Sequence, residues 1–75
     1  LKAGEHILNY PTGTIISFFS PYPVKNLTLK GFRYNLENQN NDLYFVGISN
    51  VCEQTENSIE FESGIVFLYQ VLKEN

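Results

Sequence analysis

Short runs of β-branched and aromatic residues, separated by turn-forming residues, most constrain what this chain can fold into. The run "TGTIISFFS", residues 12–20, is one of them, with Gly13 and Pro21 near its ends. Such residues favour half-buried strands, whereas glycine and proline favour the turns between them. No segment shows a convincing amphipathic helix. The sequence therefore predicts an all-β fold.

Four further strands are predicted along the rest of the chain, at residues 26–36, 43–51, 58–62 and 65–72. Gly31 is expected to form a bulge in the first of these, because the apolar alternation changes parity there. The amide-rich "ENQNND", residues 37–42, is predicted to be a hairpin turn, since asparagine tolerates left-handed conformations. Residues 1–10 are expected to hold either a helical turn or another short strand.

Five short strands in 75 residues predict a single domain over residues 1–75, folded as a small five-stranded antiparallel barrel. Closure is favoured because it removes most of the exposed strand edges of an open sheet. The alternative is a curled antiparallel sheet that dimerises through one edge. A chain of this length buries roughly 60% of its unfolded surface, so marginal stability is expected.

The composition of the chain limits the cellular environments in which the protein is expected. No apolar run approaches the roughly 20 residues needed to cross a bilayer, so no membrane association is expected. Cys52 is the single cysteine, which excludes an internal disulfide and fits a reducing compartment. A packed, inert thiol in a cytoplasmic protein is the preferred interpretation. Because the chain contains no methionine, Leu1 is not expected to be the natural start.

The sequence gives no basis for catalysis, for a metal site or for a cofactor. His6 is the only histidine, and its spacing from Cys52 suits neither a zinc site nor a nucleophile pair. Glu60 and Glu62 alternate with Ile59 and Phe61, which predicts a solvated strand face rather than a calcium site. We therefore expect a non-enzymatic binding module.

Two segments resemble a known family. "KGFRYN", residues 30–35, is similar to the first ribonucleoprotein motif of cold-shock domains, and "LYFVGIS", residues 43–49, is similar to the second. "GTIISFF", residues 13–19, and "SIEFE", residues 58–62, resemble two further strands of that family. The resemblance implies a cold-shock-like barrel of the OB-fold type that binds single-stranded RNA or DNA.

The resemblance also implies a set of binding residues. Phe32, Tyr34 and Phe45 would stack on bases, and Phe18 would be a fourth ring. Stacking on aromatic rings contributes about 1–3 kcal/mol per base without reading the sequence. Lys30 would meet phosphates, and Arg33, which replaces a small glycine of the family, would add a second cation. The formal charge of −3 argues against nonspecific adhesion to nucleic acid.

Other interpretations stay open from the residues alone. Phe32 and Phe45 suit the core face of a strand as well as a binding platform. Ser17 and Gly47 replace a tryptophan and a histidine of the family, which favours a second hypothesis, a protein-interaction module that regulates or inhibits a larger protein. The final strand is apolar on both faces, which fits a homo-oligomer.

Overall fold

The computed structural model describes the backbone of residues 1–41 and 45–71, and the side chains of residues 1–40 and 46–70. Within these ranges the chain forms seven β-strands. They are β1 (Lys2–Ile7), β2 (Ile15–Ser20), β3 (Val24–Lys30), β4 (Leu36–Asn41), β5 (Phe45–Val51), β6 (Ser58–Ile65) and β7 (Phe67–Val71). The all-β prediction is confirmed.

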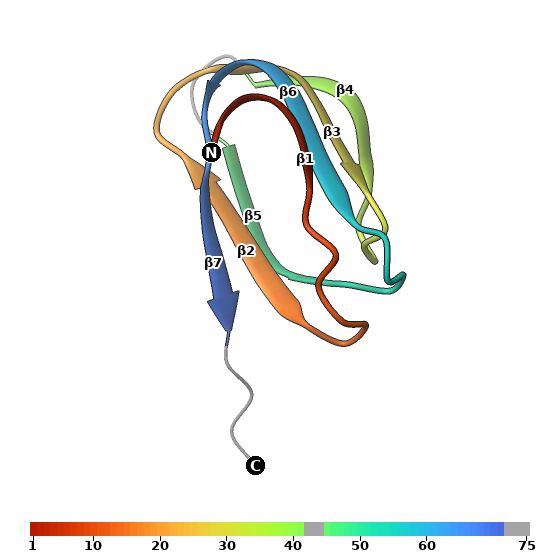
Figure 1. The fold of residues 1–75 in the computed structure, drawn as a ribbon. Helices are drawn as coiled ribbons and strands as arrows, with labels where there is room; N and C mark the ends of the chain where they lie inside the picture. Colours follow the sequence, from red (N-terminus) through yellow and green to blue (C-terminus); the bar gives the residue numbers. More distant parts are fainter. Residues whose placement is uncertain (42–44, 72–75) are drawn as a thin grey trace.

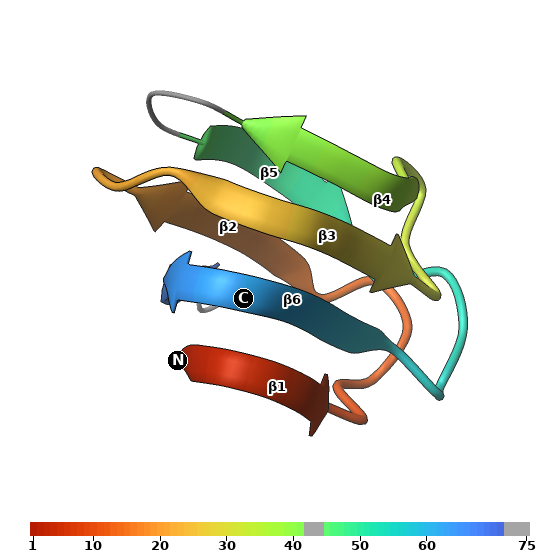
Figure 2. The same ribbon diagram turned by 90° about the horizontal axis from the view of Figure 1, so that it is seen from above.

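The strands form two antiparallel sheets rather than a barrel. One sheet has the order β1-β6-β3-β4 and the other has the order β5-β2-β7. Figure 1 shows the strands of both sheets, and Figure 2 shows β1, β6, β3 and β4 side by side in one layer over β2 and β5. Within the described ranges no ladder joins β4 to β5. The five-stranded barrel and the single curled sheet are therefore both wrong.

The core lies between the two sheets. β2 alternates across the pleat, so that Ile16 and Phe18 point inward while Phe19 is exposed. The alternation predicted for β6 is also confirmed, with Ile59 and Phe61 buried and Glu60 and Glu62 exposed. The buried apolar side chains are Ile16, Phe18, Val24, Leu27, Leu29, Phe32, Cys52, Ile59, Phe61 and Val66.

The strand predicted at residues 26–36 is interrupted. β3 ends at Lys30, the chain turns at residues 31–35, and the predicted hairpin turn at 37–42 instead falls largely in β4. Gly31 has a φ of 84° and lies in this turn, not in a bulge within a strand. Its carbonyl accepts hydrogen bonds from the backbone N–H groups of Glu53 and Gln54. A distant segment therefore fixes the turn, and no local pattern shows it.

Other boundaries also differ from the predictions. Residues 2–7 form a strand, which confirms one of the two alternatives for the N-terminal segment. Ser63 and Gly64, which separate the strands predicted at residues 58–62 and 65–72, belong to β6, and the break before β7 is at Val66. The predicted start of the strand at residues 43–51 lies partly outside the described residues. Among the residues described, no helix has the length and apolar character needed to cross a bilayer.

Candidate functional site

Phe18 and Phe32, two of the four rings predicted to stack on bases, lie in the core. Phe32 is only 3% exposed, and its backbone forms an isolated antiparallel bridge with Cys52. The rings of Phe18 and Phe32 meet edge to face, with centroids 5.6 Å apart and planes at 88°. Their faces are therefore not available to a flat ligand. The alternative interpretation of Phe32 as a core residue is confirmed.

Tyr34, in contrast, is 63% exposed. In the strand predicted at residues 26–36, a spacing of two would place Tyr34 on the same face as Phe32. Residues 31–35 instead form a turn, which has no such faces. Phe45 begins β5 and pairs through its backbone with Ser20. Its side chain lies outside the described residues, so the structure does not test whether the ring is exposed.

The two predicted cations lie at the end of β3 and in the turn that follows it. Lys30 is exposed at the end of β3. The guanidinium of Arg33 lies 4.0 Å from the carboxylate of Glu53, and both side chains are about half exposed. Such an exposed ion pair contributes about 0–1 kcal/mol to stability. Arg33 therefore faces a carboxylate within the protein.

A pocket of about 210 Å³ opens beside Tyr34. Its lining comes from β3, from the edge strand β4 of one sheet, from the edge strand β5 of the other, and from Tyr34 in the turn at residues 31–35. A mainly apolar and aromatic lining is typical of sites for small organic molecules. The lining residues are Leu29, Tyr34, Leu36, Val46, Gly47, Ile48 and Asn50.

Asn50 holds the rim of this pocket and is only 3% exposed. The N–H of Tyr34 donates to its Oδ1 over 3.0 Å, and its Nδ2 donates to the carbonyl of Tyr34 over 2.8 Å. The preceding residue, Ser49, has a φ of 56°, and its N–H donates to Oγ of Ser17 over 3.0 Å. Tyr34 was predicted from the sequence, but Ile48 and Asn50 were not. No sequence pattern predicts the left-handed backbone of Ser49 within β5.

Two further surface pockets in the described part of the chain are more polar. One of about 410 Å³ lies on the outer face of the four-stranded sheet and includes Asn26, Glu60 and Glu62, with the amide of Asn26 donating to the carboxylate of Glu62. Another, of about 310 Å³, lies along β3 and β4 and includes Lys30 and Glu37. In the described part of the chain no three His, Cys, Asp or Glu side chains are arranged to hold a metal ion.

Cys52 is buried and free, as the sequence predicted. It belongs to the same core cluster as Phe32, and it is not among the residues that line the apolar pocket. Burial raises the pKa of the Cys52 thiol, because it disfavours the charged thiolate. The apolar pocket beside Tyr34 is therefore the candidate site for an organic ligand.

Comparison with known protein families shows the family of this chain. Residues 5–66 match the family described as "Thiamin pyrophosphokinase, vitamin B1 binding domain". No curated protein matches the chain significantly.

Solved structures give the same fold. A thiamin pyrophosphokinase family protein from Enterococcus faecalis is 24% identical with a TM-score of 0.85, over 99% of this chain and 35% of that one. Thiamine pyrophosphokinase from Bacillus subtilis is 28% identical with a TM-score of 0.77, over 91% of this chain and 33% of that one. Thiamin pyrophosphokinase from Geobacillus thermodenitrificans is 22% identical with a TM-score of 0.79, over 96% of this chain and 35% of that one. The chain thus spans about a third of the length of these structures.

These findings correct the functional prediction. The cold-shock resemblance is wrong, because the family match covers most of the chain and names a different family. Single-stranded RNA or DNA as the partner is wrong for the same reason. The protein-interaction alternative has no support either, since the family's description names a vitamin as what the domain binds.

Proposed function

This chain belongs to the family of thiamin pyrophosphokinase vitamin B1-binding domains, and on that premise we propose that it binds thiamin in the apolar pocket beside Tyr34. The observation that carries this proposal is the exposed tyrosine ring at the rim of an apolar pocket, whose described lining residues include no charged side chain.

The chemistry of thiamin suits this surface. Thiamin has an aminopyrimidine ring joined through a methylene group to a cationic thiazolium ring. The face of Tyr34 can stack on either ring and attracts a cation through its π-electrons. Leu36, Val46 and Ile48 supply apolar contact around it. The formal charge of −3 further favours a cationic ligand over an anionic one.

The size of the pocket indicates a partial site. Its volume of about 210 Å³ lies below the roughly 300–1,000 Å³ of complete small-molecule sites. We therefore expect it to hold one ring of thiamin and to leave the other at the opening. In this proposal the chain serves a pyrophosphokinase reaction by holding the vitamin, and further groups carry out the transfer. The predicted single domain over residues 1–75 and the cytoplasmic location stay predictions.

A titration of the ¹⁵N-labelled chain with thiamin tests the proposal. We expect the amide signals of Tyr34, Gly47, Ile48 and Asn50 to shift, with a dissociation constant on the order of 1 mM for a partial site. Tyr34→Ala is expected to weaken binding by roughly tenfold, because it removes the stacking ring.

Tyr69→Ala is the matched control, because Tyr69 is similarly exposed but lies on β7, and the pocket does not include it. Its thiamin affinity should equal that of the wild type. Unshifted amide signals at about 10 mM thiamin, or shifts confined to another face, would contradict the proposed site.

A further inference from the structure

Two buried asparagines make the same pair of bonds to two tyrosine backbones. Asn50 accepts from the N–H of Tyr34 and donates to its carbonyl, over 3.0 and 2.8 Å. Asn57 accepts from the N–H of Tyr10 and donates to its carbonyl, over 3.1 and 2.9 Å. Each carboxamide therefore holds both polar groups of one residue's main chain. We call these arrangements the Asn50 clamp and the Asn57 clamp.

The two clamps hold tyrosines in different surroundings. Tyr10 is partly buried and packs against the core, so its ring already has a fixed place. Tyr34 is mostly exposed at the rim of the pocket, so core packing does little to fix its ring. The direction in which Tyr34 leaves the main chain is set by the turn, and the Asn50 clamp fixes that turn at Tyr34 itself.

Asn50 is also tied to β5. Its Oδ1 accepts a second hydrogen bond, from the N–H of Val51 over 3.0 Å. The neighbouring Arg33 N–H donates to the carbonyl of Val51 over 2.8 Å. The turn that carries Tyr34 is therefore attached to the strand that carries Ile48, and the two sides of the pocket are held together.

We propose that Asn50 is a positioning residue for the ligand, acting through Tyr34 by holding its ring ready at the pocket rim. This inference rests on the proposed thiamin site. A ring held in its bound position loses less conformational entropy when the ligand arrives, so the clamp strengthens binding without touching the ligand. Asn50 also lines the pocket, so direct contact with the ligand is the competing explanation.

A double-mutant cycle separates the two explanations. Thiamin affinity is measured for the wild type, Asn50→Ala, Tyr34→Ala and the double variant. We expect Asn50→Ala to weaken binding roughly two- to tenfold in the wild-type background. In the Tyr34→Ala background it should cause no further loss, because no ring remains to be positioned. Equal losses in both backgrounds would show direct contact and overturn the positioning role.

Asn57→Ala is the matched structural control. It removes an equivalent clamp and should lower the free energy of unfolding to a similar degree, while thiamin affinity stays unchanged. If it weakens thiamin binding as much as Asn50→Ala does, general loosening of the fold explains both effects, and the inference is overturned.

A second variant and a ligand-free measurement cover the case in which Asn50→Ala does not fold. The chain has no tryptophan, so Tyr34→Trp provides a single fluorescent reporter at the pocket rim. In this Tyr34→Trp background, the second substitution Asn50→Asp keeps the side-chain volume but removes the N–H donor to the carbonyl of residue 34. The anisotropy of the reporter should fall at neutral pH and recover at acid pH, where the protonated carboxyl again donates. An anisotropy unaffected by Asn50→Asp overturns the inference.

The outcomes distinguish this inference from its premise. A wild-type chain that does not bind thiamin overturns the proposed function and the ligand-positioning role together. A wild-type chain that binds thiamin, with equal losses from Asn50→Ala in both backgrounds, overturns the positioning role alone.

Discussion

Phe32 and Tyr34 are two residues apart, yet one ring is buried and the other is exposed. The difference originates in the local backbone. The N–H of Phe32 donates to Oδ1 of Asn35, which closes a tight turn, and the Phe32 ring then packs against Phe18 in the core. The N–H of Tyr34 then donates to Oδ1 of Asn50, and this hydrogen bond directs the Tyr34 ring outward. Side-chain direction here follows the turn and not the alternation of a strand.

This contrast predicts unequal costs of two equivalent truncations. Phe32→Ala should lower the free energy of unfolding by about 3–5 kcal/mol, because it leaves a cavity in the core. Tyr34→Ala should change it by no more than about 0.5 kcal/mol, as for most exposed positions. Urea unfolding followed by circular dichroism measures both, and Phe32→Leu serves if the alanine variant is unfolded. Equal losses would contradict the placement of the two rings.

The site was only partly predictable from the sequence. Tyr34 was predicted as a binding residue through the resemblance to cold-shock domains, and that resemblance is wrong. Asn50 and Ile48 give no such signal, because their places depend on the left-handed backbone of Ser49 and on bonds to residues 16 positions or more away. The chemistry of the ligand was also beyond the pattern, since an exposed ring suits a base as well as a vitamin.

At the scale of elements, the turn between β3 and β4 depends on one glycine. A Cβ on Gly31 would lie 2.3 Å from the carbonyl oxygen of Glu56 and 2.8 Å from Cα of Asn57. Both are backbone atoms, so the turn has no room for a side chain. Gly13 has a similar φ of 89°, but a Cβ there would meet nothing within 4 Å.

A comparison of alanine substitutions at these two glycines therefore separates the cost of backbone strain from the cost of a steric conflict. Gly13→Ala should cost about 1–2 kcal/mol of unfolding free energy, the usual penalty of a left-handed backbone for an L-residue. Gly31→Ala carries the same penalty and must also displace the segment at residues 56–57, so its loss should be clearly larger. Thermal unfolding of the two variants provides the comparison. A Gly31→Ala variant as stable as Gly13→Ala would contradict the close approach.

The elements that alternate clearly in the sequence were predictable, and β4 was not. Its sequence, "LENQNN", is poor in strand-forming residues, and most of it falls in the turn predicted at residues 37–42. Pairing with β3 makes it a strand, supported by the bond from the N–H of Asn38 to Oγ1 of Thr28 and by that from the N–H of Asn26 to Oδ1 of Asn40. Tertiary pairing therefore outweighs local propensity at this edge.

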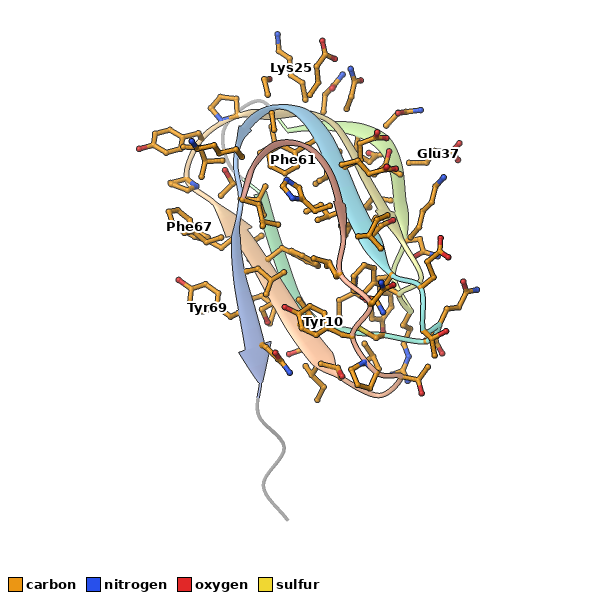
Figure 3. The ribbon with its side chains drawn as sticks, viewed as in Figure 1. Tyr10, Lys25, Glu37, Phe61, Phe67 and Tyr69 are labelled. Atoms are coloured by element: carbon orange, nitrogen blue, oxygen red, sulfur yellow. The ribbon has the colours of Figure 1, made fainter. Side chains whose placement is uncertain are left out.

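At the scale of the whole molecule, the two sheets have unlike outer faces. The four-stranded sheet exposes Glu60 and Glu62 beside amides, whereas the three-stranded sheet exposes Phe19, Phe67 and Tyr69. Figure 3 shows Phe67 and Tyr69 on the outer side of β7. Strands that are apolar on both faces give no inside–outside pattern, which is why the two-sheet arrangement could not be derived from the sequence.

Between the sheets, Cys52 links the stability of the whole molecule to pH. Its folded pKa is raised by burial, so above the ordinary cysteine pKa of about 8.5 the unfolded chain loses a proton that the folded chain keeps. Stability from this thiol is fully present below that pH and is lost as the pH rises through the folded pKa. The slope is at most about 1.4 kcal/mol per pH unit.

Cys52→Ala isolates this contribution, because the tyrosines and lysines titrate equally in both proteins. Under reducing conditions, the difference in unfolding free energy between wild type and variant should be constant up to about pH 8 and should shrink above it. Urea unfolding at a series of pH values measures the difference. The cavity left by alanine lowers the variant's stability by the same amount at every pH, so it changes the offset and not the trend. Parallel curves to about pH 11 would show that burial does not hold the proton on Cys52.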